Sequence, residues 1–553
     1  MPTIAAEDLL LKKAFVEGLD RERNQWRLLW RELADFYLPN RYMWLLTDKE
    51  RAASRARNEY ILDSTGTSAA RTLAAGLMNG ITSPSRPWFK LRIPGSYDQR
   101  NKRIREWLDE VERRLAIIFA ESNFYNAMQI LYLDLAVFGT AGILIYEDAD
   151  SIIRCYNVAL GEYYLANSAR QTVDTFARKF TMPARAVMQQ FPDESYWSDY
   201  LKNLKLKGGA ALLEPVHLCH LVEPNEGKIV GSRFKFQELY WEANASTNNK
   251  LLGAAGFYEF PGIFPRWELS PGAAYGVSPG MDGLGDVIQL QQETKRKAQG
   301  LDKMVSPPLI LPIELQNRPT ALMPGGVTYV SGSSNVKAES VYNVNIPIQD
   351  LAMDIAAVQE RIRNTFYNSL FNGVSNLSTV RSAKEIEVRQ EERLVLLGGV
   401  LERVENEGID PSITRTFNIA QRMGLMPDPP EELESAEVEI QYVSILSVAQ
   451  RAVATIPTER LLQLTGQLAG VYPEATQIPN IPQLVRDYAI DIGVRATGIN
   501  SEEEVAARLV AKQQQEATAQ SLAAAESASK SATNLAQAEV GGGQNALQML
   551  LGN

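Results

Sequence analysis

The chain has 553 residues, enough for several domains and a large buried core, and its 45% apolar and 22% charged residues are typical of a soluble globular protein. Its 56 Lys and Arg residues against 66 Asp and Glu give a net charge of −10, which argues against tight, general DNA binding but not against a surface past which DNA slides. No apolar run approaches the roughly 18 residues of a transmembrane helix, the N-terminus lacks the order of a signal peptide, and two cysteines are too few for a disulfide framework, which fits a reducing cytosol.

The first part of the chain is predicted to consist of helices. One covers residues 6–38, with apolar side chains on one face and Arg and Glu on the other. The next begins at the cap Asp63–Ser64 and carries a run of small side chains, which suggests that another backbone approaches it closely. Two more helices are expected over residues 104–118 and 122–139.

Short strands replace the helices between residues 142 and 267. They are expected over residues 143–146, 152–156, 173–180, 216–222, 233–241 and 251–257. A short helix over residues 183–191 interrupts them, with Thr181 as its cap and Pro183 at its first position. The pattern predicts an α+β region that forms one domain with the N-terminal helices.

Two amphipathic helices flank a compact insert in the middle of the chain. The first is expected over residues 286–304, behind a loop rich in Gly and Pro, and the second over residues 349–371, while residues 309–346 between them have the pattern of a small β unit. The packing face of the first helix consists of Val287, Leu290, Thr294, Ala298, Leu301 and Val305. Its opposite, polar and basic face consists of Gln292, Arg296, Gln299 and Lys303. Because the insert joins the two helices, we expect a helical hairpin.

The C-terminal third is predicted to be helical. A third long helix begins at a capping box formed by Ser382 and Glu385, is expected to kink at Gly398–Gly399, and has Gly408 as its C-cap. A Pro- and Glu-rich linker over residues 427–434 marks a boundary. More helix follows and ends in an Ala-, Gln- and Ser-rich segment before a Gly-rich tail.

No pattern in the sequence predicts an enzyme. Gly276-Val-Ser278-Pro-Gly280 matches the G-x-S-x-G motif of hydrolases, but Pro279 has no backbone N–H for an oxyanion hole. The required histidine should also follow the serine, whereas the only two histidines precede it. The glycines near position 280 lack the G-K-[ST] that completes a phosphate loop.

His217, Cys219 and His220 lie close enough in sequence to suggest a metal site. On a strand, however, His217 and Cys219 share one face while His220 points to the other. No other Cys or His lies nearby in sequence to complete tetrahedral coordination, so the sequence favours ordinary strand residues and no metal.

Five long blocks, in order along the chain, carry a family resemblance. They read LDSTGTSAARTLAAGLMNGITSPSRPWFKL (62–91), SNFYNAMQILYLDLAVFGTAGILIY (122–146), RW…YGVSPGMDGLGDV (266–287), KMVSPPLIL (303–311) and SAKEIEVRQEERLVLLGGVLERVENEGIDP (382–411). Together they resemble the portal, or head-to-tail connector, proteins of short-tailed double-stranded DNA bacteriophages. Where relatives commonly carry Leu-Pro-Asp, this chain has Leu284-Gly285-Asp286, so the start of the helix is expected to be looser.

The resemblance implies an α+β, mainly helical portal fold, assembled as a ring of about twelve subunits around a central channel. Its parts would be a wing (1–285), a first stem helix (286–304), a clip (305–348), a second stem helix (349–368), a tunnel loop (369–382), a kinked helix with the wing–crown connection (383–434), crown or barrel helices (435–540) and a flexible tail (541–553).

The resemblance also implies a function and partners. The ring would form the channel at one capsid vertex through which double-stranded DNA is packaged and ejected, without sequence specificity. The clip would dock the terminase large subunit and later tail adaptor or nozzle proteins, and the wing would face the major capsid and scaffolding proteins. The ring would assemble in the bacterial host cytoplasm and remain in the virion, with no membrane, no cofactor and no enzymatic activity.

Charge then suggests which residues meet DNA. About twelve acidic copies make a ring that repels phosphate, so DNA is held weakly, and scattered cations give short-lived contacts that depend on salt. The candidates for DNA contact are Lys295, Arg296 and Lys303 on the first stem helix and Arg381 in the tunnel loop. The candidates for partner binding in the clip are Pro307, Pro308, Gly325, Gly326 and Tyr329.

Two other interpretations of the sequence remain open. The first is a non-channel oligomeric scaffold or assembly protein of the capsid, which would use the same hairpin for self-association. The second is a large α+β enzyme whose active site follows no known motif. The shape of the purified protein distinguishes all three.

Overall fold

The computed structural model describes residues 6–45, 60–85, 87–92, 102–227, 229–243, 250–305, 309–310, 339–340, 347–372, 398–430, 439–442, 458, 460–467, 479–491 and 502–537. It divides the chain into two compact units. The first comprises Met1–Trp88, Arg114–Met426 and Ser444–Gln450, and the second Phe89–Arg113, Pro427–Val443 and Arg451–Asn553. The described part is mainly helical with several sheets, so the predicted α+β class is confirmed. Within these ranges, no helix is both long enough and apolar enough to cross a bilayer.

The predicted N-terminal helices are present. They are α1 (Ala6–Tyr37), α3 (Thr65–Ile81), α5 (Lys102–Glu121) and α6 (Phe124–Phe138). A 3₁₀ helix that was not predicted, η1 (Pro39–Leu45), follows α1. The small side chains of α3 do allow close packing, because α3 lies against α6 and the ring of Phe371 rests directly on Gly76. At the N-terminus of α3 it is Asp63, not Ser64, whose carboxylate accepts the hydrogen bond from the Thr65 N–H, at 2.8 Å.

The strands between residues 142 and 263 form two antiparallel sheets. The larger has the order β4-β5-β6-β7-β8 and the smaller β3-β2-β9. Their bounds are β2 Gly142–Asp148, β3 Ile152–Val158, β4 Tyr163–Asn167, β5 Val173–Pro183, β6 Pro215–Pro224, β7 Phe236–Glu242, β8 Gly253–Phe257 and β9 Gly262–Ile263. Six of these match the predicted strands, whereas β4 and β9 were not predicted.

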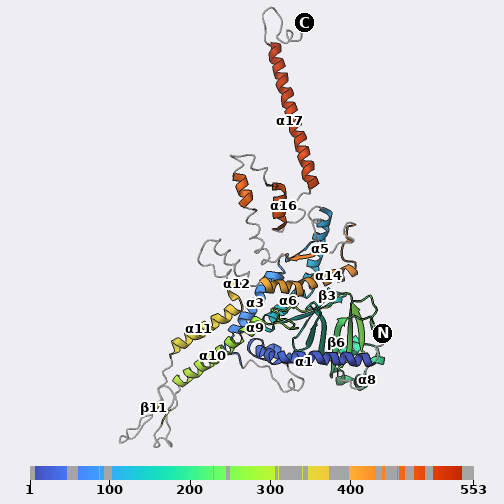
Figure 1. Ribbon diagram of the computed structural model, residues 1–553, viewed down its shortest axis with the longest axis vertical. Helices are drawn as coiled ribbons and strands as arrows, with labels where there is room; N and C mark the ends of the chain where they lie inside the picture. The colour runs from blue at the N-terminus through green and yellow to red at the C-terminus, as the bar shows by residue number, and fades with distance from the viewer. Residues whose placement is uncertain are drawn as a thin grey trace, which may run out of the picture. The chain divides into compact units, whose positions relative to one another are not determined.

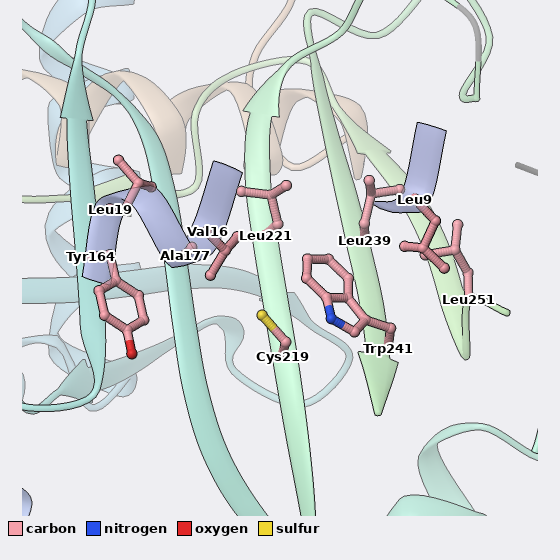
Figure 2. Close-up of a cluster of buried hydrophobic side chains, with 10 residues drawn as sticks. All are labelled: Leu9, Val16, Leu19, Tyr164, Ala177, Cys219, Leu221, Leu239, Trp241 and Leu251. Atoms are coloured by element: carbon pink, nitrogen blue, oxygen red, sulfur yellow. The ribbon is translucent and has the colours of Figure 1, made fainter. Parts of the chain in front are cut away.

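Both faces of the larger sheet are buried. On one face α1 contributes Leu9, Val16 and Leu19 to a cluster that includes Cys219 and Trp241 (Figure 2). On the other face Leu218 packs with residues of α7 (Ala184–Gln190) and α8 (Asp199–Lys207). Successive side chains of β6 therefore enter opposite cores, and burying one apolar side chain of this size stabilises the fold by about 1.5–3 kcal/mol.

The predicted cap of the short helix is wrong. Thr181 lies in β5, where it pairs with His217 of β6, so the strand continues through Pro183. Helix α7 begins only at Ala184, and Pro183 occupies the N-cap position without a side-chain hydrogen bond. Strand pairing has prevailed over the local helix signal here.

A helical hairpin follows the sheets. A short helix, α9 (Pro279–Asp282), precedes α10 (Leu284–Val305), and α11 (Ile348–Thr365) returns beside α10 and is followed by α12 (Asn368–Asn372). Between α10 and α11, the strands β10 (Leu309–Ile310) and β11 (Glu339–Ser340) pair antiparallel. Figure 1 shows α10 and α11 side by side with β11 beyond their ends, which confirms the predicted hairpin with a β pair in its insert.

The third long helix differs from the prediction. Ser382 and Glu385 lie outside the described residues, as does the approach to Gly398–Gly399. Residues 398–404 are helical and pass through a π-helical turn, Glu405–Ile409, into α14 (Asp410–Arg422). Gly408 is therefore not a C-cap, because the chain continues as helix beyond it.

The second compact unit contains helices and one unpredicted strand pair. β1 (Phe89–Arg92) pairs antiparallel with β12 (Glu439–Tyr442). Helices α16 (Ile481–Asp491) and α17 (Glu502–Gln537) confirm the prediction of a helical C-terminal segment.

Candidate functional site: the helical hairpin

The inner half of the hairpin has an apolar seam. Val287 and Leu290 of α10 are fully buried, as are Val358 and Ile362 of α11. The predicted packing face is thus correct where the hairpin joins the rest of the first unit. It is wrong for the outer half, where Ala298 is exposed, Leu301 is 40% exposed and Val305 is 82% exposed. Within the described residues, no other element covers these side chains.

A polar network fixes the inner end of the hairpin to the start of α3. The side-chain oxygen of Gln291 accepts hydrogen bonds from the Leu62 and Asp63 N–H groups, at 2.7 and 2.8 Å. Its amide nitrogen donates to the Asp63 carbonyl at 2.9 Å, and Gln359 of α11 donates to the Asp63 carboxylate at 2.7 Å. One short segment at the start of α3 therefore holds both helices of the hairpin.

Asp63 is suited to this role as a carboxylate. Burial acts to raise its pKa, but hydrogen bonds from Thr65 and Gln359, with the charge of Arg363, outweigh burial and lower the pKa. The network thus contains an ionised acceptor at neutral pH, which makes its hydrogen bonds stronger than neutral ones.

Replacing Gln291 with Met is expected to lower the free energy of unfolding by about 2–3 kcal/mol, because three hydrogen bonds are lost and two backbone N–H groups lose their acceptor. Thermal unfolding and faster hydrogen exchange at Leu62 and Asp63 would measure this loss. Gln292→Met is the matched control, since Gln292 is exposed on the next position of the same helix. Equal effects of the two substitutions would contradict the role given to the network.

The glycines in the loop before the hairpin allow close packing of its backbone against the end of α6. A Cβ at Gly276 would lie 2.4 Å from the Gly139 carbonyl oxygen, and a Cβ at Gly280 would lie 2.6 Å from the Val137 carbonyl oxygen. Both positions therefore require glycine, because no larger residue fits against the end of α6. The glycines of the hydrolase-like pattern serve packing.

Ser278 is committed to the same contact. Its buried hydroxyl donates to the Val137 carbonyl at 2.6 Å and accepts from the Met281 N–H at 3.1 Å, so it caps α9, with Pro279 at the first helical position. Helix α10 begins at Leu284, so Gly285 is its second residue, and the looser start expected there stays a prediction.

The predicted DNA-facing residues fall into two groups. Lys295, Arg296 and Lys303 are exposed on the outer half of α10, and Gln292 and Gln299 of the polar face are exposed with them. Arg381 lies outside the described residues. The clip candidates also lie outside them, namely Pro307, Pro308, Gly325, Gly326 and Tyr329.

Sequence reasoning missed an ion pair that links the two helices. Arg361 of α11 donates to the Asp286 carboxylate of α10 at 3.0 Å and to the Gln289 side chain at 3.3 Å. The signal was a charge of opposite sign near the inner end of each helix, but the pairing of the two needs the hairpin geometry.

His217, Cys219 and His220 all lie on strand β6, as ordinary residues of a strand. Within the described residues, no group of three or more potential ligands comes together. His220 stacks on Tyr240 with its Nε2 2.8 Å from the Glu238 carboxylate, while Cys219 faces the opposite core. Burial lowers the pKa of His220, and burial raises the pKa of the Cys219 thiol to about 12. Cys219 and His220 are therefore core residues, whereas His217 is only half-buried.

Comparison with known proteins places this arrangement in a family. The family model described as bacteriophage head to tail connecting protein matches residues 11–499. A probable portal protein of Bordetella phage BPP-1 is 35% identical over 502 residues, which cover 90% of this chain and 89% of the relative. The portal protein of Salmonella phage epsilon15 is 35% identical over 508 residues, which cover 90% of each chain.

Proposed function

This chain belongs to the family of bacteriophage head-to-tail connecting proteins, the portal proteins, and on that premise we propose that its copies assemble into a ring of about twelve subunits around a central DNA channel. The ring occupies one vertex of the phage capsid. Double-stranded DNA passes through it during packaging and ejection, without sequence recognition. The chain itself performs no chemistry in this proposal.

The hairpin supports this assignment. Its inner half is held to the rest of the first unit by the buried apolar seam and the polar network. Its outer half presents exposed apolar and charged side chains. In the proposed ring, α10 and α11 form the stem, residues 305–348 the clip and residues 369–382 the tunnel loop. The chain up to residue 285 forms the wing, residues 383–434 connect wing and crown, residues 435–540 form the crown, and residues 541–553 a flexible tail.

The partners follow from this layout. The clip docks the terminase large subunit during packaging and tail adaptor proteins afterwards, because it lies at the free end of the hairpin. The wing contacts the major capsid and scaffolding proteins. Assembly takes place in the host cytoplasm, and the finished ring stays in the virion.

The observation that carries the DNA channel is the stripe of Arg296 and Lys303. These exposed residues lie seven positions apart, and at about 100° per residue they point away from the seam that contains Leu290. Lys295 projects about 100° to the side of Arg296. Arg296 and Lys303 therefore face the channel when α11 lies behind α10, and Arg381 adds a cation in the tunnel loop.

Arg296→Glu combined with Lys303→Glu is expected to leave ring assembly intact but to reduce DNA-filled particles by about tenfold, because each subunit exchanges two attractive charges for repulsive ones. Packaging and DNA retention in particles assembled with the variant would measure this. Lys207→Glu on α8 is the control, since it reverses the charge of an exposed lysine outside the hairpin. Normal packaging and retention in the double variant would refute the channel-facing role.

A further inference from the structure

The two sides of the hairpin differ in charge. The contact between Asp286 and Arg361 marks one side, since both residues must project toward it. Residues 7 and 11 positions further out on each helix fall on the same side, because these spacings complete nearly whole helical turns. This side, called flank A, consists of Asp286, Glu293, Lys297, Asp350, Asp354 and Arg361. Four carboxylates and two cations give flank A a net charge of −2.

The opposite side of the hairpin carries two alanines and an exposed lysine. The same spacings, counted from Ile288 on α10 and from Arg363 on α11, define it, and Asp302 is included because it lies seven positions beyond Lys295. This side, called flank B, consists of Ile288, Lys295, Gln299, Asp302, Ala352, Ala356 and Arg363. Two cations and one carboxylate give a net charge of +1, and Arg363 is already bonded to Glu360 of its own helix at 3.3 Å. Lys295 is therefore the cation that flank B offers to a partner.

The charges of the two flanks stand at the same level along the hairpin. Asp286 lies opposite Arg361, and α10 and α11 run antiparallel, so equal steps outward place Glu293 beside Asp354 and Lys297 beside Asp350. Lys295 thus stands between the levels of Asp354 and Asp350, on the other side of the hairpin. Lys295, Asp350 and Asp354 are all exposed, and the described part of the chain gives none of them an ion pair.

We propose that flank A of one copy packs against flank B of the next copy, with Lys295 placed between Asp350 and Asp354 of its neighbour. The partner is a second copy of this chain, and the contact is heterologous, which is the kind that closes a ring. Ala352 and Ala356 let the neighbouring helix approach closely, because the distance between packed helices depends on the side chains between them. This inference rests on the proposed ring and assigns Lys295 to subunit contact instead of DNA.

Reversing either set of charges tests the pairing. Lys295→Glu places a carboxylate against Asp350 and Asp354 of the neighbour, and Asp350→Lys with Asp354→Lys places two new lysines against Lys295. For each variant alone, the protein concentration at which rings form is expected to rise by about tenfold or more. Mass photometry at low salt measures the fraction in rings, circular dichroism verifies folding, and Lys207→Glu is the charge-matched control for Lys295→Glu.

Mixing the two defective variants gives the sharper result. In an alternating ring, the carboxylate introduced by Lys295→Glu would meet the two lysines introduced into the other variant. Lys295 of that other variant would in turn meet Asp350 and Asp354, so the mixture is expected to form rings that neither variant forms alone. The triple variant, which carries all three reversals, is expected to assemble by itself. Recovery in these two experiments also shows that the single defects did not come from misfolding.

Three outcomes would overturn the inference while leaving the proposed function intact. The first is that both reversed variants form normal rings. The second is that the mixture and the triple variant form no rings although the wild type does. The third is that Lys295→Glu impairs DNA packaging but not ring formation. Failure of the wild-type chain to form rings under any condition would instead refute the proposed function itself.

Discussion

Glu407→Ala is expected to lower the free energy of unfolding of the first compact unit by about 3–5 kcal/mol, because it leaves the buried guanidinium of Arg266 without its counter-charge. Arg266 is fully buried. Its Nε and Nη2 donate to the Glu407 carboxylate, at 3.0 and 2.7 Å. Its Nη1 donates to the Asn167 side-chain oxygen at 3.0 Å, and Nη2 also donates to the Gln171 carbonyl at 2.9 Å. Differential scanning calorimetry would measure the loss.

The comparison that isolates burial is Glu360→Ala, which breaks the exposed pair with Arg363 and is expected to leave stability almost unchanged. A second comparison is Arg266→Met combined with Glu407→Leu, which removes both charges and should recover part of the loss. A Glu407→Ala protein as stable as the Glu360→Ala protein would show that this ion pair does not hold the π-helical turn to the sheets.

Gly139→Ala is expected to lower the free energy of unfolding by about 3–5 kcal/mol, because alanine is strained in a left-handed backbone conformation and its Cβ would clash with the loop. Gly139 has a φ of 75°, and a Cβ there would lie 2.4 Å from the Gly276 carbonyl oxygen. The clash prevents the loop from approaching the end of α6, and this loop leads directly into the hairpin. Thermal unfolding of the purified protein would measure the cost.

Gly424→Ala separates the two contributions. Gly424 also has a positive φ, 70°, but a Cβ there would meet nothing within 4 Å. Its substitution should cost only the backbone term, about 1–2 kcal/mol. Equal losses for the two alanine variants would mean that the packing of the loop on α6 contributes nothing to stability.

Long periodic segments were predictable from the sequence. Helices α1, α6 and α10 follow their apolar spacing closely, because burial of one face determines where such a helix forms. Helix α11 ends at Thr365, before the expected end at residue 371, because Tyr367 adopts a positive φ of 54°. The hairpin itself followed from two such helices joined by an insert. The exposure of Arg296 and Lys303 was also correct, since a polar stripe opposite an apolar one remains in solvent.

Features that depend on distant partners were not predictable. Strand β1 pairs with β12, whose residues lie hundreds of positions later, and no local pattern encodes that choice. The π-helical turn at Glu407 needs Arg266 opposite it, and the capping pattern at Gly408 suggested an end instead. No sequence pattern singles out Gln291, whose amide bonds to the backbone of Asp63 in the folded chain.

Electron microscopy of the purified protein, with its mass measured in the same preparation, tests the ring most directly. The account predicts annular particles with an axial hole and a mass of about twelve times the 61.5 kDa of one chain. A particle without a hole would favour an assembly scaffold, and a monomer of 61.5 kDa at every concentration and salt tested would contradict the account.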